Sequence, residues 1–521
     1  MPNKFYSQQG IDFINQYFNQ NKKICADTRS LRLGDIFIAY SIDSPNDNQV
    51  NKVCNFEHIQ QAIKLKPSAV LADEKLMHDE NYAEYKNNLV ENNIPILVLP
   101  NLYEYIGDIV SYFNGYPSSK LPVIGVTGTN GKTSVSTWLA QCLNALNSPA
   151  CVIGTLGTGF LDNLQHTGFT TPDAINLHYQ LNEYAVKAGA KAVCIEVSSH
   201  GLKQCRVDGV KFHTAIFTNL TQDHLDYHGS SEDYINSKHL LFQKKNLEYA
   251  VINTDDEIGR KFIQNTTAKN IISYSMNKQN IFSNNSLYLK EYTFIAHKKQ
   301  NGYKIQLEIK WKDEYILVNL IVGVLGEFNL YNLMAVIGGL LSLNYSWQQI
   351  KEVLPNIKSV AGRLEIVKTD YSSKLVIVDY AHTPDALEKT LHALQPIAKQ
   401  RKGNLWCIFG CGGNRDKTKR PLMGKIVQDN SDIVIITNDN PRFEEPTEII
   451  KNILIGIDMD NIINHSVKVI EDRYDAINYA VQFMQEQDVL LIAGKGHETY
   501  QEIKGIKHNF NDVLIAKEFL G

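Results

Sequence analysis

A glycine-rich loop carries the most specific chemical signal in this sequence. The run is Gly125-Val126-Thr127-Gly128-Thr129-Asn130-Gly131-Lys132-Thr133-Ser134, between an apolar strand and a helix predicted over residues 135–144. The backbone N–H groups of such a loop can surround phosphate oxygens, while its lysine neutralises charge and Thr133 can bind Mg²⁺. The run therefore predicts nucleotide binding. It does not name the reaction, because GTPases, transport ATPases and kinases also carry phosphate loops.

A carboxylate follows a second apolar strand. Glu196 lies near the end of the strand predicted over residues 192–197. Open parallel sheets bind ligands at the carboxyl ends of their strands, and an acidic residue in an apolar run needs a partner. We therefore expect Glu196 to share a magnesium ion with Thr133.

Two histidines and a lysine follow a third strand. His224 and His228 are four residues apart, so a helix would place both imidazoles on one face. A zinc hydrolase is therefore an alternative, although no third ligand lies at ordinary zinc spacing. Lys238, in a helix predicted over residues 234–241, is expected from the sequence alone to face solvent.

Three α/β regions must position these groups. Short apolar segments predict a small N-terminal α/β domain over residues 1–118. Apolar strands alternating with amphipathic helices predict a central, doubly wound ATPase-like domain over residues 119–359, with antiparallel strands near residues 285–320, and a Rossmann-like α/β domain over residues 360–521. The clearest strand candidates are 36–39, 69–72, 96–99, 122–126, 151–155, 192–197, 214–218, 249–253, 375–378, 405–409, 433–437 and 489–493.

The composition is that of an ordinary globular protein. Of 521 residues, 43% are hydrophobic and 21% are charged, and the formal net charge is 52 − 56 = −4. This balance does not indicate a nucleic-acid partner. The eight cysteines form no CxxC pair, and the sequence contains no apolar run of about 18 residues. We therefore expect a cytoplasmic protein that does not insert into a membrane.

Further motifs make nearly the whole chain similar to the Mur ligase family. Besides the phosphate loop, they are Thr170-Thr171-Pro172 and residues 196–202 (EVSSHGL), 223–229 (DHLDYHG), 326–332 (GEFNLYN), 362–365 (GRLE), 379–384 (DYAHTP), 410–416 (GCGGNRD), 439–442 (DNPR) and 494–498 (GKGHE). The resemblance implies an ATP-dependent ligase that joins a carboxylate to an amine through an acyl phosphate. No covalent enzyme intermediate is expected, so Cys407 and Cys411 are interpreted as packing residues.

The resemblance also implies residues for ATP and for two magnesium ions. Lys238 would be carbamylated, so that its new carboxylate-like group binds the second Mg²⁺ together with Glu196 and His224. With Thr133, these residues are the predicted metal ligands, and Lys132 and Arg363 complete the predicted catalytic set. Further ATP contacts are expected from Asn329, Asn332, Arg363, Asp379 and His382. Of these, Arg363 and Asp379 would come from the C-terminal domain as it closes.

The carboxylate substrate implied by the resemblance is UDP-N-acetylmuramoyl-L-alanyl-D-glutamate. Its muramyl dipeptide would be bound by Thr170, Thr171, Ser198, Gln204 and Arg206. Ala26 and Thr28 would help to place the uridine nucleotide. Residues 41–57 lack the proline-glycine and aspartate-glycine signals of the family's UDP-binding loop, so no contact is carried over to that segment.

The amine acceptor is predicted to be meso-2,6-diaminopimelate. In family members that add this diacid, the DNPR arginine pairs with its distal carboxylate, and Arg442 holds that position here. A planar guanidinium suits bidentate carboxylate binding. The resemblance implies an acceptor site made of Arg415, Asp439, Asn440, Pro441, Arg442, Gly494 and Glu498.

Several alternatives stay open at this point. L-Lysine could be the acceptor, or the chain could be a ligase like folylpolyglutamate synthetase, which shares the GTNGK loop and the carbamylated lysine but requires neither the N-terminal domain nor DNPR. A nucleotide-switched binding protein and an inactive scaffold are alternatives of another class. The expected partners are the small-molecule substrates alone, and the protein is predicted to be a monomer.

Overall fold

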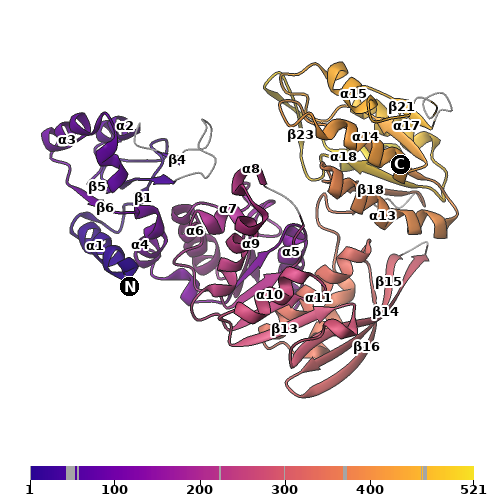
Figure 1. The fold of residues 1–521 in the computed structure, drawn as a ribbon, viewed down its shortest axis with the longest axis horizontal. Coiled ribbons are helices and arrows are strands. Elements are labelled where there is room, and N and C mark those ends of the chain that lie inside the picture. Colours follow the sequence, from indigo (N-terminus) through magenta and orange to yellow (C-terminus); the bar gives the residue numbers. More distant parts are fainter. Residues whose placement is uncertain are drawn as a thin grey trace. The chain divides into compact units, whose positions relative to one another are not determined.

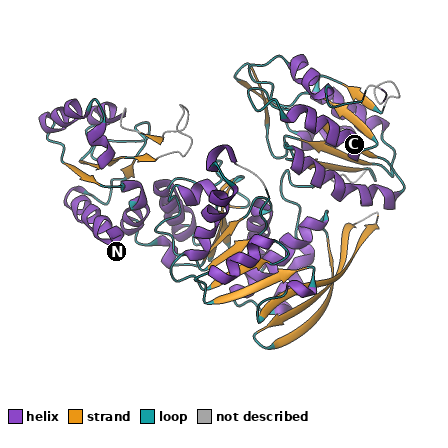
Figure 2. Cartoon of the chain, viewed as in Figure 1, coloured by secondary structure: helices purple, strands orange, loops and turns teal. Residues whose placement is uncertain are grey.

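The computed structural model describes residues 2–42, 53–54, 58–221, 225–297, 300–367, 372–458, 460 and 466–521. The chain forms two compact units. The first contains Met1–Tyr288, Ile309–Tyr315 and Met334–Ile350, and the second contains Leu289–Glu308, Ile316–Leu333 and Lys351–Gly521. Figures 1 and 2 show helices packed on both faces of the larger sheets, as predicted for an α/β protein. The predicted domain boundaries at residues 118 and 359 stay predictions.

The N-terminal part of the first unit is a four-stranded parallel sheet in the order β1-β2-β5-β6. Its strands are β1 (Ile24–Cys25), β2 (Ile36–Ala39), β5 (Ala69–Asp73) and β6 (Ile96–Leu99). Its helices are α1 (Pro2–Tyr17), α2 (Ile59–Lys64), α3 (Tyr82–Glu91) and α4 (Ile106–Phe113), and β3 (Ser41–Ile42) pairs with β4 (Val53–Cys54). Apolar residues on both faces of this sheet are buried, as expected for parallel strands covered by helices.

A ten-stranded sheet follows, in the order β16-β15-β14-β13-β12-β11-β7-β10-β8-β9. Its strands are β7 (Val123–Thr127), β8 (Ala150–Gly154), β9 (Gly157–Phe160), β10 (Ala192–Glu196), β11 (Thr214–Phe217), β12 (Tyr249–Asn253), β13 (Asn270–Ser275), β14 (Asn285–His297), β15 (Gln300–Trp311) and β16 (Glu314–Val322). Strand β7 lies between β10 and β11 and is parallel to both. The carboxyl ends of these three strands therefore share one edge.

Helices complete this part of the fold. They are α5 (Lys132–Ala145), α6 (Ala174–Gln180), α7 (Ser199–Lys203), α8 (Leu225–His228), α9 (Ser231–His239), α10 (Glu257–Asn265), α11 (Glu327–Ser342) and α12 (Trp347–Val353). The predicted antiparallel excursion corresponds to the long strands β14 to β16. Lys312 and Asp313 both have positive φ between β15 and β16, which is the geometry of a tight two-residue hairpin turn.

The second unit contains a six-stranded sheet in the order β17-β18-β22-β19-β20-β21. Its strands are β17 (Glu365–Val367), β18 (Leu375–Asp379), β19 (Leu405–Phe409), β20 (Ile433–Ile436), β21 (Val467–Val469) and β22 (Val489–Ala493), and only the β17–β18 pairing is antiparallel among the pairs described. The helices are α13 (Pro384–Arg401), α14 (Lys419–Asn430), α15 (Pro446–Leu454), α17 (Arg473–Phe483) and α18 (Asp512–Leu520). A hairpin of β23 (Tyr500–Ile503) and β24 (Ile506–Asn509) follows β22.

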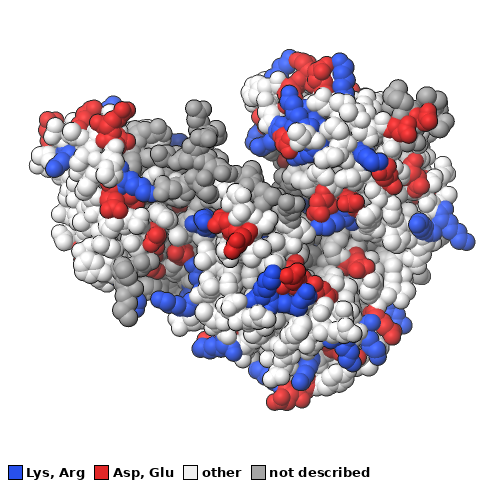
Figure 3. Space-filling model, viewed as in Figure 1, with Lys and Arg blue, Asp and Glu red and all other residues white. Residues whose placement is uncertain are grey.

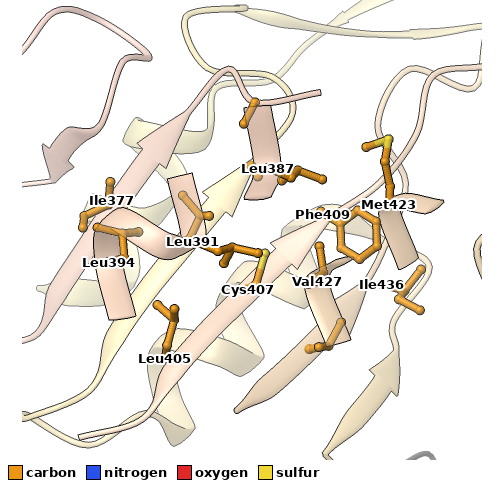
Figure 4. Packing of buried hydrophobic residues seen from close by; sticks show 14 of the residues in the cluster. Ile377, Leu387, Leu391, Leu394, Leu405, Cys407, Phe409, Met423, Val427 and Ile436 are labelled. Atoms are coloured by element: carbon orange, nitrogen blue, oxygen red, sulfur yellow. The ribbon is translucent and has the colours of Figure 1, made fainter. Parts of the chain in front are cut away.

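The core of the second unit explains why its central strands were predictable. Figure 4 shows Leu387, Leu391 and Leu394 of α13 lying over side chains of β18 and β19. Each of β18, β19 and β22 is buried along its full length, so all their residues are apolar or small apart from the last residue of β18. Cys407 and Cys411 belong to this core, which confirms their interpretation as packing residues.

Candidate active site

The phosphate loop lies between β7 and α5, as predicted. Gly128 and Gly131 have φ of 149° and 88°, which few other residues adopt, and a Cβ at Gly128 would lie 1.9 Å from the Thr218 hydroxyl. The Lys132 ammonium donates hydrogen bonds to the carbonyl oxygens of Gly128 and Thr129, at 2.9 and 2.8 Å. The lysine therefore lies against the loop, where its charge can act on a bound phosphate.

The segment after β11 fixes the shape of this loop. Asn219 accepts hydrogen bonds from the backbone N–H groups of Thr129, through its carbonyl at 2.8 Å, and of Asn130, through its side chain at 3.1 Å. Thr218 donates from its hydroxyl to the Asn130 carbonyl at 2.6 Å. The Thr129 hydroxyl lies 3.0 Å from the hydroxyl of Tyr234 on α9. Adjacent parallel strands thus bring two distant loops together at one edge of the sheet.

Glu196 and Thr133 meet as predicted. The Thr133 hydroxyl donates to Glu196 Oε2 at 2.8 Å, and Glu196 is only 2% exposed. Thr155 donates to the same carboxylate from its backbone N–H at 2.8 Å and from its hydroxyl at 3.1 Å. Gly154 makes room for it, since a Cβ there would lie 2.2 Å from Glu196 Oε1. Hydroxyl and carboxylate oxygens are the ligands that Mg²⁺ prefers, so this pair fits a magnesium ion.

The structure corrects the expectation that Lys238 faces solvent. Lys238 lies on α9 and is only 1% exposed. Its ammonium donates to the Gly128 carbonyl at 2.9 Å and lies 4.5 Å from the centre of the Tyr234 ring. The sequence-only expectation is wrong because α9 packs against the phosphate loop, which a helix sequence with few apolar residues does not reveal. The predicted carbamylation of Lys238 and its role as a metal ligand stay predictions.

The structure describes only one of the two histidines. His224 lies outside the described residues, so its predicted role as a metal ligand stays a prediction. His228 is buried, and its ring nitrogens lie 3.1 Å from Asp233 Oδ2 and 3.0 Å from the Ser199 hydroxyl. These partners account for both nitrogens of His228 without a zinc ion.

The residues predicted to bind the dipeptide form one hydrogen-bonded group beside Glu196. The Thr171 hydroxyl lies 2.8 Å from the Glu196 carbonyl oxygen and 3.0 Å from the Ser198 hydroxyl. The Arg206 guanidinium donates to Gln204 Oε1 at 2.9 and 2.6 Å and to the Thr171 carbonyl at 2.8 Å. These contacts fix the guanidinium, and its predicted contact with the dipeptide stays a prediction.

Thr170 joins this group, and Ala26 and Thr28 lie elsewhere in the first unit. The Thr170 hydroxyl is 3.0 Å from that of Thr155, which itself binds Glu196. Ala26 and Thr28 follow β1 in the N-terminal sheet, where the buried Thr28 donates to Gln61 Oε1 at 3.0 Å. The described contacts neither link these two residues to the Glu196 group nor test their predicted role with uridine.

The second unit contains the other residues predicted to contact ATP. Asn329 and Asn332 are buried on α11, where Asn332 donates to Asn329 Oδ1 at 2.8 Å. Asp379 ends β18 and accepts from the backbone N–H groups of Leu364 and Ala381 at 2.7 and 2.8 Å. Burial raises the pKa of the Asp379 carboxyl, and Arg363 opposes that shift.

Arg363 and His382 both contact one aromatic ring, that of Tyr380. The Arg363 guanidinium lies 4.7 Å from the centre of the Tyr380 ring, in cation–π contact. His382 packs edge-on against the same ring and bonds to the Tyr380 carbonyl at 2.8 Å through Nδ1. Contacts with the segment between β18 and α13 therefore bring together three of the predicted ATP residues, which are Arg363, Asp379 and His382.

Arg442 lies at the carboxyl ends of β20 and β22, together with the rest of the predicted acceptor site. Its guanidinium donates to the Gly413 carbonyl at 2.9 Å and lies 3.4 Å from the carboxylate of Glu502. Its backbone has φ of 52° and is bonded on both sides to the β23–β24 hairpin, through Glu502 and Lys504. The arginine is therefore held in place before any ligand binds.

Asn440 connects this arginine to the GKGHE segment. Its side chain donates to Glu498 Oε2 at 2.8 Å and accepts from the Lys495 ammonium at 3.1 Å and the Glu502 backbone N–H at 2.9 Å. Gly494 is required here because a Cβ would lie 2.5 Å from Asp439 Oδ2. Pro441 is buried between Asn440 and Arg442. The structure thus brings together most of the residues predicted for the acceptor.

The sequence did not identify three residues that the structure places at this site. Lys495 and Glu502 belong to the group itself, and Arg420 holds one of its loops in place. Lys495 is fully buried and lies 3.1 Å from Glu498, although its place in GKGHE marked it as a candidate. Glu502 had no signal of its own. Arg420 is buried and forms two hydrogen bonds of 3.0 Å to Glu444, which holds the loop carrying the exposed Arg415. Arg415 and Arg442 both approach Gly412, since a Cβ there would lie 3.7 Å from the side chain of Arg415 and 2.9 Å from that of Arg442.

The surface and the helices complete the description. On the face drawn in Figure 3, basic and acidic side chains are interspersed across the described residues. No helix among the described residues is both long and apolar enough to cross a bilayer. The seven cysteines whose side chains are described are free thiols, and all but Cys205 are buried.

Comparisons with known proteins agree with this geometry. The Mur ligase middle domain matches residues 126–340, and the Mur ligase glutamate ligase domain matches residues 362–496. The UDP-N-acetylmuramoyl-L-alanyl-D-glutamate--2,6-diaminopimelate ligase of Chromobacterium violaceum is 40% identical over 501 residues, which are 96% of this chain and 94% of that protein. A solved structure of a ligase of the same name is 33% identical, with a TM-score of 0.64 over 96% of this chain and 94% of that chain.

A more distant structure shares the fold alone. The folylpolyglutamate synthase of Mycobacterium tuberculosis complexed with ADP is 15% identical, with a TM-score of 0.58 over 76% of this chain and 92% of that chain. The two matched domains, the full-length relative and the phosphate loop with its Glu196 carboxylate lead to one conclusion: the chain belongs to the Mur ligase family of ATP-dependent, amide-bond-forming enzymes.

Proposed function

We propose that this enzyme joins meso-2,6-diaminopimelate to the D-glutamate of UDP-N-acetylmuramoyl-L-alanyl-D-glutamate, a step in peptidoglycan precursor synthesis. The observation that carries the choice of acceptor is the fixed guanidinium of Arg442, which Gly413, Glu502 and the hairpin backbone hold at the carboxyl end of the sheet. Such a group suits the distal carboxylate of a diacid, which L-lysine lacks. The names of the full-length relatives support the same assignment.

The reaction has two steps. The D-glutamate γ-carboxylate attacks the γ-phosphorus of ATP, which gives an acyl phosphate and ADP. The acceptor amine then attacks the activated carbonyl, and phosphate leaves as the amide bond forms. Lys132 offsets the negative charge of the transferring phosphoryl group, and the Arg206 group holds the dipeptide so that its carboxylate faces the loop.

We further propose two magnesium ions at this site. Thr133 and Glu196 supply oxygen ligands for one ion, and a carbamate on Lys238 would supply oxygen ligands for the second, with Glu196 and His224. Magnesium offsets the crowding of anionic oxygens during phosphoryl transfer. A monomeric enzyme acting in the cytoplasm remains our prediction.

The test is phosphate release with ATP, Mg²⁺ and the UDP-muramyl dipeptide, comparing meso-diaminopimelate with L-lysine. We expect release to depend on the amine and to prefer diaminopimelate strongly. Lys132→Ala should abolish turnover with the fold intact, since removing a charge from a phosphate site typically costs about 100-fold or more in rate. Preference for lysine would refute the acceptor assignment.

The same assay separates the alternatives. A ligase like folylpolyglutamate synthetase would need a folate substrate and would ignore the muramyl dipeptide. A nucleotide-switched binding protein would hydrolyse ATP whether or not either substrate were present. An inactive scaffold would release no phosphate with any acceptor.

A further inference from the structure

Thr155 lies between the carboxylate proposed to bind magnesium and a threonine proposed to contact the dipeptide. Its hydroxyl is 3.1 Å from Glu196 Oε2 and 3.0 Å from the hydroxyl of Thr170. Its backbone N–H donates to Glu196 Oε1 at 2.8 Å, which holds the residue against the carboxylate. The proposed function gives roles to Glu196 and Thr170 but none to Thr155, although Thr155 joins the two.

The directions of these hydrogen bonds follow from the atoms involved. A carboxylate only accepts, so the single hydroxyl hydrogen of Thr155 points to Glu196. The Thr155 oxygen can then only accept from Thr170, whose own hydroxyl hydrogen is used in that bond. Both threonine hydrogens therefore point along one chain toward the carboxylate.

This arrangement competes with a cation at Glu196. Oε2 accepts from the Thr133 hydroxyl at 2.8 Å and from the Thr155 hydroxyl at 3.1 Å, and each carboxylate oxygen has about two lone-pair sites. A magnesium ion at Oε2 needs one of these sites. Thr133 can release its bond because its own oxygen also suits the ion, whereas Thr155 must turn its hydrogen to another acceptor.

A ligand that accepts a hydrogen bond from Thr170 removes this competition. The hydroxyl hydrogen of Thr170 then points to the ligand, and the Thr170 oxygen becomes free to accept from Thr155. The Thr155 hydrogen leaves Glu196 Oε2, which opens a lone pair for the ion. Each ligand thus makes binding of the other more favourable, and the coupling is equal in both directions.

We infer that Thr155 is a positioning residue that couples dipeptide binding to magnesium binding, by reversing the direction of the hydroxyl hydrogens of Thr155 and Thr170. The inference rests on the proposed function, because it takes Thr170 to contact the dipeptide and Glu196 to bind Mg²⁺. It assigns Thr155 a role that needs no contact with either ligand. The site would hold its metal most tightly when the carboxylate to be activated is present.

The experiment measures the Kd of the UDP-muramyl dipeptide by calorimetry, without ATP, in the presence and in the absence of MgCl2. For the wild-type protein, we expect the ratio of the Kd without Mg²⁺ to the Kd with Mg²⁺ to be roughly fivefold or more, as is usual for coupled sites. Thr155→Val keeps the shape of the side chain but removes its hydroxyl. Its ratio should fall roughly threefold or more, the scale of one hydrogen bond to a charged group.

The fall in Thr155→Val should come from tighter dipeptide binding without Mg²⁺. In that variant the dipeptide no longer costs Glu196 a hydrogen bond, so the metal-free protein gains affinity. A merely structural role of Thr155 would instead weaken dipeptide binding under both conditions. Magnesium bound by the pyrophosphate of the substrate affects the wild type and the variant equally and cancels in their comparison.

Two further variants isolate the hydroxyl. Thr155→Ser keeps it and should keep the wild-type ratio. Thr158→Val is a matched control, because it makes the same change at a buried threonine whose hydroxyl donates to Gln180 Oε1 at 3.0 Å. This variant should also keep the wild-type ratio.

Four results would overturn the inference. They are a wild-type ratio near one, an unchanged ratio in Thr155→Val, an equal fall in Thr155→Ser, and weaker binding in Thr155→Val with and without Mg²⁺ alike. A wild-type protein that does not bind the UDP-muramyl dipeptide under either condition would refute the proposed function instead, which is a distinct result.

Discussion

The carboxylate of Glu196 is held by three hydrogen-bond donors and enclosed by a glycine. Thr133 and Thr155 supply the donors, and Gly154 leaves the space that the carboxylate fills. The position of an oxygen ligand matters because a misplacement of about 1 Å can lower a rate by roughly 100-fold. Gly154, at the end of β8, therefore helps to determine the position of the Glu196 carboxylate.

Gly154→Ala tests this dependence. The added methyl would lie 2.2 Å from Glu196 Oε1, so the carboxylate must move and its bond from Thr133 must break. We expect kcat to fall roughly tenfold or more, and the Mg²⁺ concentration that gives half-maximal activity to rise, because a displaced ligand weakens Mg²⁺ binding. Steady-state phosphate release across a magnesium titration measures both effects.

Gly339→Ala is the matched control for that variant. It introduces the same methyl group against Leu139, at 2.8 Å, without touching Glu196. Its thermal stability should fall while its magnesium dependence stays that of the wild type. Equal losses of activity in the two variants would mean that packing, and not the position of Glu196, governs the effect.

At this scale the sequence predicted the residue types well and their surroundings poorly. Thr133 and Glu196 were predictable as a pair because each follows an apolar strand of one parallel sheet. The burial of Lys238 was not, because it depends on how α9 packs against a loop more than 100 residues away. Glu502 lay on a hairpin whose exposed residues gave no pattern, so only its contact with Arg442 identifies it.

Among the elements, two loops of the second unit are joined by contacts to Glu444, which forms an ion pair with the buried Arg420. Residues 410–418 follow β19 and residues 437–445 follow β20. Glu444 accepts from Arg420 and from the Asn414 N–H, while Phe443 N–H donates to Asn414 Oδ1 at 3.1 Å. Arg442 adds its own bond to Gly413. The two loops therefore behave as one structural element.

We predict that Glu444→Gln weakens acceptor binding more than catalysis. The variant loses the charge that Arg420 faces, which loosens the loops bearing Arg415 and Arg442. The acceptor KM should rise roughly fivefold or more, the usual scale for weakening a charged hydrogen bond, while the KM for ATP stays within about twofold. Steady-state kinetics with each substrate varied in turn will measure both values.

Lys417→Ala provides the comparison for that prediction. Lys417, in the first of these loops, also approaches Glu444, at 3.3 Å, but its side chain is 66% exposed. An exposed ion pair contributes little, so this variant should behave as the wild type. A rise in the KM for ATP equal to that for the acceptor in Glu444→Gln would contradict the prediction.

The elements themselves were largely predictable from apolar runs. β12, β19 and β22 begin and end where the sequence predicted, because each is buried on both faces. The order of strands in the sheets was not, since sequence spacing does not say which strands pair. The long β14 to β16 were predicted only as an antiparallel excursion, as their alternating pattern fixes the type of strand but not its length.

For the whole molecule, acid should weaken the surroundings of His178 and of Glu444 over different pH ranges. In the first unit, burial lowers the pKa of His178 from 6.5 to about 4. Between these pH values the unfolded chain binds a proton at His178 and the folded chain does not. Stability is therefore lost as the pH falls from 6.5 to about 4. In the second unit, Arg420 lowers the pKa of Glu444 from 4.5 to about 2, so the stability from that carboxylate is lost only between pH 4.5 and about 2.

Hydrogen exchange at a series of pH values, corrected for intrinsic exchange rates, will follow each unit separately. Peptides that contain or contact His178 should lose protection at a higher pH than peptides that contain or contact Glu444. His178→Gln, which keeps a donor for the Asp208 carbonyl but does not titrate, should flatten the loss between pH 6.5 and 4. An unchanged profile in that variant would mean that other groups control the acid response of the first unit.

The backbone of Arg442 has a consequence for how this protein can change. Its φ of 52° is a conformation that costs an ordinary residue about 1 kcal/mol, whereas glycine and asparagine adopt it readily. Replacing this arginine by either residue would therefore relax the fold while removing the group that recognises the acceptor. Substitution of Arg442 by glycine or asparagine would thus relieve backbone strain but impair acceptor recognition. The arginine therefore persists only where selection on acceptor choice continues.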